Sequence, residues 1–177
     1  EEKGHKVELK IIMTSGDQSQ QWETGFDKLD GKGFFTKELE EALLNKGIDL
    51  AVHSHKDLPT VSPEGLIVAG VSKREDPSEL IIIRKDCVDE NQKFNLKQKA
   101  LVGTSSARRK SQLLAFRPDI EIKDLRGNVP TRIKKLRDGE YDAIMLAYAG
   151  VERLELNLVD LHVEKLSPEE FVPVPAQ

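Results

Sequence analysis

The sequence predicts an α/β fold in two domains, and three observations support this prediction. Segments with the period of a strand alternate with segments with the period of a helix. The 177 residues are enough for one large domain or two small ones, and for a hydrophobic core. Near the middle, the polar stretch 72–77 separates two apolar strand-like runs, and we predict the domain boundary there.

The first domain is expected to contain three strands and one helix. Apolar and polar residues alternate over 7–13, which is typical of a strand. Residues 35–43 place their apolar side chains on one helical face, and Gly47 is a suitable helix end. The short apolar runs 48–52 and 66–71 are also predicted to be strands.

The second domain is expected to begin with a buried strand over 80–83, followed by a short strand over 101–103. Thr and Ser residues come next and suit the N-terminus of a helix over 107–116. Pro118 ends this helix because proline cannot continue it.

Further alternation of strand and helix follows. Residues 120–125 alternate apolar with charged side chains, and residues 129–136 show helical spacing. A strand over 141–149 leads into a helix that starts at residue 151. The last residues, 171–177, contain two prolines and predict an extended linker.

Composition restricts the possible functions. Hydrophobic residues make up 38% of the chain and charged residues 33%, and no apolar run approaches the ~20 residues of a membrane span. The net charge of −4 argues against a general nucleic-acid binder, which needs a basic face. The single cysteine, Cys87, excludes an internal disulfide and slightly favours a reducing compartment. Because the chain does not begin with methionine, we expect its native start to lie upstream.

Four arginines lie where predicted helices begin. Arg108 and Arg109 fall in the first turn of one helix, and Arg126 and Arg132 flank the start of the next. The helix dipole favours negative charge at this end, so we infer that an anionic ligand supplies it. Guanidinium groups, hydroxyls and free backbone N–H groups suit carboxylates or phosphates. The alternative is a solvated basic face whose arginines pair with carboxylates of the chain.

A second polar group, residues 53–57, follows the predicted strand 48–52. Its carboxylate, Asp57, suits the stabilisation of a cation that develops in a transition state, and it equally suits the capping of a turn. His53 and His55 would point to opposite sides of an extended chain, so no metal site is predicted.

These motifs together resemble the porphobilinogen deaminase family of tetrapyrrole biosynthesis. The combination of HS-x-KD, GTSS-x-RR and LRGN at these separations is very specific. Asp30, Ala107 and Pro130 depart from residues that are common in the family, without removing a charged site residue. The matching segments are residues 14–17, 31–40, 49–60, 74–77, 103–112, 125–132 and 139–154.

The resemblance implies a hydroxymethylbilane synthase, which condenses four porphobilinogen units head to tail and releases ammonia. It implies two domains of the type II periplasmic-binding-protein-like kind around a cleft, and a third domain whose cysteine carries a dipyrromethane cofactor. The expected parts are residues 1–73 as domain 1 without its N-terminal part, 74–78 as a hinge, 79–170 as domain 2 and 171–177 as a return linker toward domain 1.

The resemblance also implies the roles of the site residues. Asp57 matches the catalytic aspartate, which contacts pyrrole N–H groups and steadies the cation left when ammonia departs. The pyrroles carry acetate and propionate groups, so the other matched residues would bind carboxylates or donate hydrogen bonds. These residues are Lys32, Ser54, Lys56, Thr104, Ser105, Ser106, Arg108, Arg109, Arg126 and Arg132.

The resemblance further implies that the third domain and its cofactor cysteine are absent from these 177 residues, and that Cys87 is not that cysteine. We therefore expect the residues by themselves to have little or no activity. The expected partner is a polycarboxylated pyrrole, with no nucleic acid and no membrane, and the expected protein is a cytoplasmic monomer. The alternative is a non-catalytic two-domain anion- or solute-binding protein, which would not need Asp57 in its HS-x-KD setting.

Overall fold

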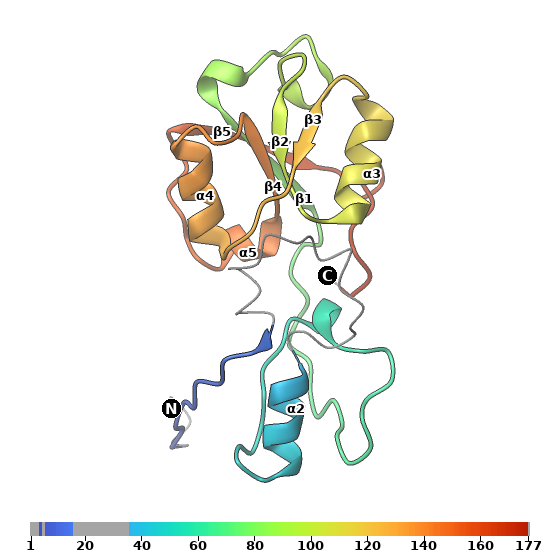
Figure 1. Cartoon of the computed structure of the whole chain (residues 1–177), viewed down its shortest axis with the longest axis vertical. Helices are drawn as coiled ribbons and strands as arrows, with labels where there is room; N and C mark the ends of the chain where they lie inside the picture. Colours follow the sequence, from blue (N-terminus) through green and yellow to red (C-terminus); the bar gives the residue numbers. More distant parts are fainter. Residues whose placement is uncertain (1–3, 5, 16–35, 177) are drawn as a thin grey trace. The chain divides into compact units, whose positions relative to one another are not determined.

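A computed structural model describes residue 4, residues 6–15 and residues 36–176 (Figure 1). The described residues divide into two compact units, which we call unit 1, ending at Ser72, and unit 2, beginning at Lys73. Helices and strands both occur, with a mixed sheet in unit 2, so the predicted α/β class is confirmed. No helix in these described ranges is long and apolar enough to cross a membrane.

Unit 1 contains the helix α2, Lys37–Leu44, and the 3-10 turn η3, His55–Asp57. The predicted helix is thus confirmed from Lys37 onward. At its C-terminal end, the Gly47 N–H donates to the carbonyl of Ala42 at 2.8 Å. The left-handed residue of this helix end is Lys46, with φ 55°, and not the glycine that follows it.

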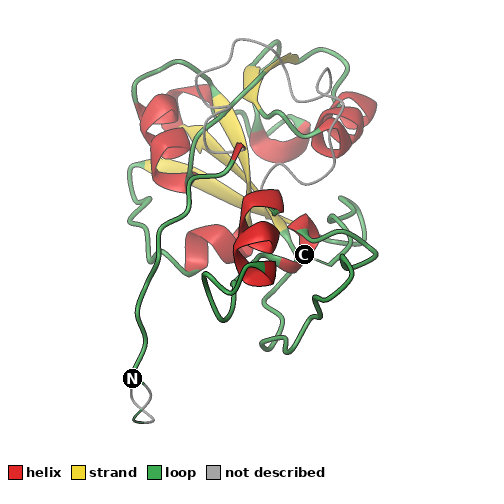
Figure 2. Cartoon of the chain, turned by 60° about the horizontal axis from the view of Figure 1, so that its bottom comes forward, coloured by secondary structure: helices red, strands yellow, loops and turns green. Residues whose placement is uncertain are grey.

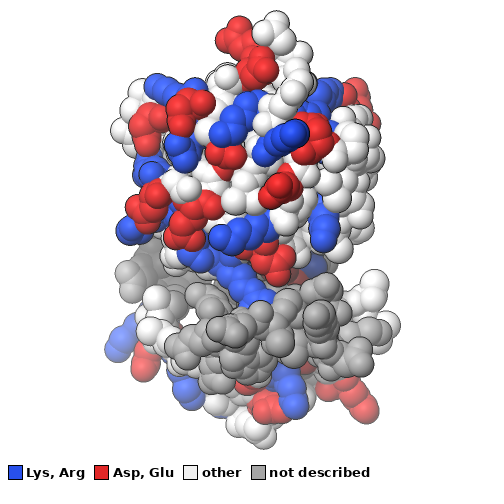
Figure 3. All heavy atoms as spheres, turned by 45° about the horizontal axis from the view of Figure 1, so that its top comes forward, with Lys and Arg blue, Asp and Glu red and all other residues white. Residues whose placement is uncertain are grey.

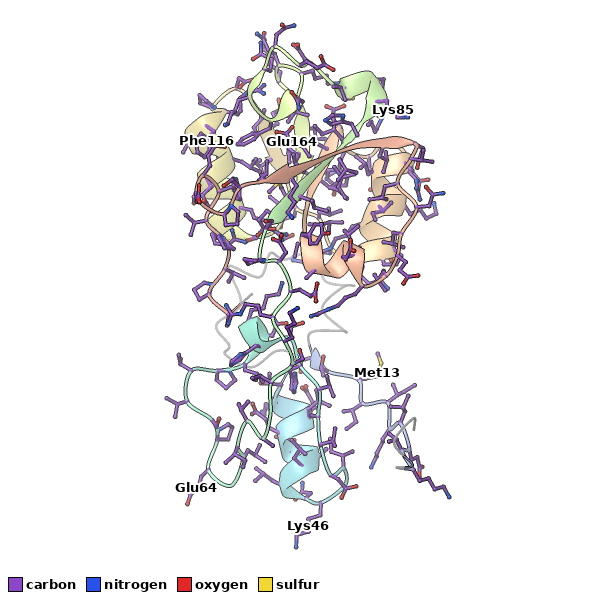
Figure 4. All side chains as sticks on the ribbon, turned by 180° about the vertical axis from the view of Figure 1, so that it is seen from behind. Met13, Lys46, Glu64, Lys85, Phe116 and Glu164 are labelled. Carbon is purple, nitrogen blue, oxygen red and sulfur yellow. The ribbon has the colours of Figure 1, made fainter. Side chains whose placement is uncertain are left out.

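The three strands predicted for unit 1 are wrong. The described residues 7–13, 48–52 and 66–71 form no β-strand. Their apolar side chains are largely exposed, 90% for Leu9 and 89% for Ile11, and Figure 4 shows Met13 projecting away from the backbone. An alternating segment becomes a strand only when a neighbouring strand takes up its backbone hydrogen bonds, and the described part of unit 1 contains none.

Unit 2 is built on a five-stranded sheet with the order β3-β2-β4-β1-β5. β2 pairs in parallel with both β3 and β4, whereas β1 pairs antiparallel with β4 and β5. Helical crossovers between β2, β3 and β4 explain their parallel direction. The strands are β1 (Glu79–Arg84), β2 (Leu101–Gly103), β3 (Glu121–Lys123), β4 (Ala143–Ala147) and β5 (Leu161–Leu166).

Helices cover both faces of this sheet, as Figures 1 and 2 show. Successive side chains of β1 point to opposite faces, so Ile81 packs in one core with Leu113 of α3, and Ile82 in the other with Ile133 of α4. The result is a three-layer arrangement with a buried central strand. The helices are α3 (Ala107–Phe116), α4 (Val129–Arg137) and α5 (Tyr148–Glu152).

The strands and helices predicted for this half of the chain are confirmed, with three differences. α5 begins at Tyr148, inside the segment predicted as strand. β5 is not among the predicted elements; it lies at the sheet edge and exposes much of its middle. Phe171, in the predicted extended linker, is fully buried, and its ring meets that of Phe94 with centroids 6.2 Å apart.

The segment between β1 and β2 contains two 3-10 turns, η4 (Lys85–Cys87) and η5 (Lys93–Asn95), and Arg117 fastens it to α3. The buried guanidinium donates to the backbone carbonyls of Leu96 at 2.7 Å and Lys97 at 3.0 Å. Its Nε and Nη2 also bind the carboxylate of Asp119, at 2.7 and 2.8 Å. This arginine therefore has one carboxylate partner of its own.

Candidate anion-binding site

The start of α3 holds the first pair of arginines in place. Ser106 is the N-cap, and its hydroxyl accepts the backbone N–H of Arg109 at 3.4 Å. The Thr104 hydroxyl in turn accepts the N–H of Ser106 at 3.2 Å. The predicted helix start is confirmed, and Arg108 and Arg109 fall in its first turn.

Ser105 joins the two strand-to-helix junctions of unit 2. Its hydroxyl donates to the Leu125 carbonyl at 3.1 Å and accepts the Leu125 N–H at 3.0 Å. Because β2 and β3 are parallel neighbours, their C-terminal ends meet at the same edge of the sheet. The loop after β2 and the loop after β3 are therefore fixed side by side.

The second junction places Arg132 next to a glycine turn. Gly127 has φ 111°, and a Cβ at this position would approach Thr131 Cγ2 to 2.8 Å, so the tight turn requires glycine. Asn128 caps α4 by accepting the Thr131 N–H at 2.9 Å. The Nε of Arg132 donates to the Gly127 carbonyl at 2.7 Å, and Arg126 is half-buried in the same turn.

A fully buried carboxylate, that of Glu79 in β1, pairs with both arginines of α3. Its Oε1 bonds Arg108, and its Oε2 bonds Arg109 at 2.6 Å. The Nη1 of each arginine donates to a backbone carbonyl, that of Arg108 to Val172 at 2.6 Å and that of Arg109 to Met145 at 3.1 Å. These two arginines thus pair with a carboxylate of the chain, as the alternative expectation had it. That carboxylate is buried, however, and does not lie on a solvated face.

Positive charge remains in excess at this place. The pKa of Arg132 is lowered, first by burial and second by the positive charge of Arg109 nearby. On the outer face of unit 2 shown in Figure 3, by contrast, acidic and basic side chains are interspersed. The cluster of Arg108, Arg109 and Arg132, with Glu79 as its carboxylate, is therefore a local concentration of cations, as an anion-binding site requires.

The predicted site residues form two groups. Unit 2 brings together Thr104, Ser105, Ser106, Arg108, Arg109, Arg126 and Arg132 at its two junctions. In unit 1, Asp57 lies in η3 with Lys56, directly after Ser54, and all three are exposed. Lys32 lies outside the described residues.

Glu79 is the main site residue that sequence reasoning misses. A signal for it exists, because a glutamate opens an otherwise apolar strand, ELIII, that is buried throughout. A buried acid in such a strand needs a cationic partner, and the fold, not the sequence, identifies that partner as the arginine pair of GTSS-x-RR. The contact of Val172 with Arg108 has no comparable signal, since it involves a backbone carbonyl.

Cys87 is unsuited to a reactive role. Burial raises the pKa of its thiol, and the hydrogen bond that it donates to Asp142, at 3.1 Å, raises the pKa further. The thiol is therefore held in its protonated, unreactive form. In the described ranges, no group of three or more His, Cys, Asp or Glu side chains is arranged to hold a metal ion.

The whole chain, residues 1–177, matches a family described as porphobilinogen deaminase, dipyromethane cofactor binding domain. The porphobilinogen deaminase of Sulfurimonas denitrificans is 49% identical over 174 residues, which cover 96% of this chain and 52% of that protein. The porphobilinogen deaminase of Nitratidesulfovibrio vulgaris is 50% identical over 172 residues, which cover 97% and 52%. The chain thus spans about half the length of the curated relatives it matches.

A periplasmic binding protein of Salmonella typhimurium shares 14% identity over 55% of this chain and 43% of its own, with a TM-score of 0.42, too low to carry an argument. The family match over the full length and the identities near one half are decisive by themselves. They show that this chain belongs to the porphobilinogen deaminase family.

Proposed function

We propose that the protein containing this chain is a hydroxymethylbilane synthase, a transferase that condenses four porphobilinogen units head to tail and releases ammonia. Membership of the family supports the reaction. One structural observation carries the proposal: Arg108 and Arg109 share the carboxylate of Glu79, and the charge of Arg109 lowers the pKa of Arg132 nearby. Carboxylates of a substrate would supply the negative charge that this cluster lacks.

The acetate and propionate groups of the pyrroles are the proposed ligands of the arginines. Arg132 is the best placed of these arginines. Its Nε donates to the Gly127 carbonyl and its charged neighbour is Arg109, so its outer N–H donors suit a carboxylate. Arg109 is 8% exposed and would act mainly through its charge. We propose that Arg126, Lys32 and Lys56 add further cations and that Ser54, Thr104, Ser105 and Ser106 provide hydroxyls.

Asp57 is the proposed catalytic residue. When ammonia leaves porphobilinogen, positive charge stays on the pyrrole, and an ionised carboxylate near the ring N–H stabilises it. The exposed position of Asp57 in η3 supports this role, since the side chain is open to a ligand.

The dipyrromethane cofactor of the family consists of the same polycarboxylated pyrroles, so the excess of cations at the junctions fits it. Arg108 and Arg132 would hold its carboxylates, and Arg109 would add its charge. When bound, the cofactor supplies the pyrrole end to which the first substrate unit is joined. Cys87 does not fit as its attachment point, because the thiol is buried, protonated and bonded to Asp142.

We infer domains at residues 1–73 and 79–170, a hinge at 74–78 and a return linker at 171–177; the division between Ser72 and Lys73 supports the first boundary. The proposed protein is a cytoplasmic monomer that binds polycarboxylated pyrroles and no nucleic acid. The net charge of −4 supports the last point, because nucleic-acid binding needs a basic face.

The test is the substitution Asp57→Asn in the complete protein, meaning the natural polypeptide that contains these residues. We expect turnover of porphobilinogen to fall by about a hundredfold or more, the effect of losing transition-state stabilisation, with the thermal midpoint unchanged. Asp49→Asn, at another exposed aspartate of unit 1, is the matched control and should keep its turnover. Full turnover by Asp57→Asn would overturn the role of Asp57, and a wild-type protein that binds porphobilinogen without turning it over would favour the non-catalytic anion-binding alternative.

A further inference from the structure

We propose that Glu79 is a positioning residue for the anion-binding site: it holds Arg108 and Arg109 side by side, so that Arg108 faces the ligand carboxylates in a fixed arrangement and Arg109 adds its charge from the interior. The inference rests on the proposed function and adds a residue to it. Glu79 itself is fully buried at the first position of β1, so it acts through the arginines and not by touching substrate.

The carboxylate of Glu79 is shared between two neighbouring guanidinium groups. Oε1 bonds Arg108 and Oε2 bonds Arg109, the latter at 2.6 Å. Each guanidinium also donates to one backbone carbonyl, of Val172 at 2.6 Å or of Met145 at 3.1 Å. Two charge-assisted bonds and two carbonyl bonds therefore fix the orientation of both side chains.

The carbonyl that orients Arg108 is itself held by α3. The side chain of Gln112 accepts the Val172 N–H at 2.7 Å and donates to the Val172 carbonyl at 3.0 Å. Gln112 lies one helical turn after Arg108, so the same helix face presents the arginine and fixes its second partner. Arg108 is thus bounded by Glu79 on one side and by Val172 on the other.

The number of arginines that share one carboxylate distinguishes Glu79 from the carboxylate of an ordinary structural ion pair. Arg117, a structural arginine, shares its carboxylate partner Asp119 with no other arginine in the described chain. Glu79 instead serves two arginines, with Arg132 near enough to be affected by Arg109. It therefore reduces the repulsion that would drive the pair apart, and still leaves a positive excess for a ligand.

The test compares Glu79→Gln with Glu79→Asp in the complete protein, with porphobilinogen as the probe. The amide keeps the shape and removes the charge, so we expect KM to rise about tenfold or more, the value of one lost charge-assisted bond, with kcat within about threefold. Glu79→Asp keeps the charge and should restore most of the affinity, leaving KM raised by about threefold.

Asp142→Asn is the matched control. This carboxylate of unit 2 binds Lys97 at 2.9 Å and the Leu101 N–H at 2.8 Å, away from the arginine pair. Its loss should lower the melting temperature and leave KM within about twofold of wild type. If Glu79 had only a structural role, Glu79→Gln would give the same result.

The outcomes are distinct. A KM for Glu79→Gln that matches the Asp142→Asn control would overturn the role of Glu79 alone. If Glu79→Gln does not fold, Glu79→Asp decides: an unchanged KM overturns the proposal, and a raised KM at retained kcat supports it. Absence of porphobilinogen turnover in the wild-type protein would overturn the proposed function itself.

Discussion

The guanidinium of Arg132 has a lowered pKa because it is half-buried and because the positive charge of Arg109 lies near it. Two neighbouring cations removed in part from water are unfavourable without a counter-ion. The nearby carboxylate, Glu79, is occupied by Arg108 and Arg109. Positive charge is therefore in excess at this site.

The first prediction concerns Arg132→Gln. In the complete protein, porphobilinogen at about one hundred times its Kd should stabilise the wild type by about 2.7 kcal/mol. The variant loses a charged partner for the ligand, so its melting temperature should rise much less under the same conditions. Without ligand, the lost hydrogen bond to Gly127 is partly offset by the relief of repulsion, and stability should change by no more than about 1 kcal/mol. Equal ligand-induced shifts in the two proteins would contradict the assignment.

The second prediction compares two arginines that each bind one aspartate through two N–H groups. Arg117→Ala leaves the buried carbonyls of the β1–β2 segment without a donor, so unfolding in urea should become easier by about 3 kcal/mol. Arg137 binds Asp160 in a similar way but is far more exposed, 41% for its side chain. Arg137→Ala should therefore cost less than about 1 kcal/mol. If the two variants lost similar free energies of unfolding, burial of the arginine would not determine the size of the loss.

The third prediction is a dependence of stability on acid pH. The hydrogen bond from Arg117, and next the N–H of Lys99, hold the pKa of Asp119 well below its ordinary value of 3.8. A carboxyl whose pKa is lower in the folded state stabilises the fold above its unfolded pKa and loses that contribution as pH falls. The free energy of unfolding should thus decline below about pH 4, and less steeply in Asp119→Asn. Parallel curves for the two proteins, measured by urea titration, would contradict this.

The sequence predicts unit 2 well because each segment there has a partner that satisfies its pattern. The run 80–83, which becomes the middle of β1, is apolar throughout, and in the structure both of its faces are buried under helices. The residues after β2 predict a helix start, and Ser106 caps α3 as expected. Local signals and tertiary packing agree at these places.

In unit 1 the same kind of pattern fails, for a physical reason. Alternation at Leu9 and Ile11 shows that a segment fits a half-buried sheet surface, but it does not supply the neighbouring strand. β5 escapes prediction for the opposite reason, because the pairing with β1 makes it a strand although its middle is exposed. Pairing between distant segments cannot be read from either segment alone.

The candidate site is only partly accessible to sequence reasoning. The positions of Arg108 and Arg109 at a helix start follow from the GTSS motif and its capping residues. Their partner Glu79 lies 29 and 30 residues away in the chain, and only the fold brings it to them. The roles of these residues and of Asp57 in binding and catalysis stay predictions.

The most direct test of the central claim is the release of ammonia by the complete protein supplied with porphobilinogen. We predict one ammonia for each porphobilinogen consumed. We also predict that kcat/KM for Arg132→Gln is lower by about tenfold or more, because one charged contact to a carboxylate is lost. Arg137→Gln, at the exposed arginine paired with Asp160, should match the wild type. If Arg132→Gln released ammonia as efficiently as Arg137→Gln, the arginine cluster would not be the site that holds the substrate.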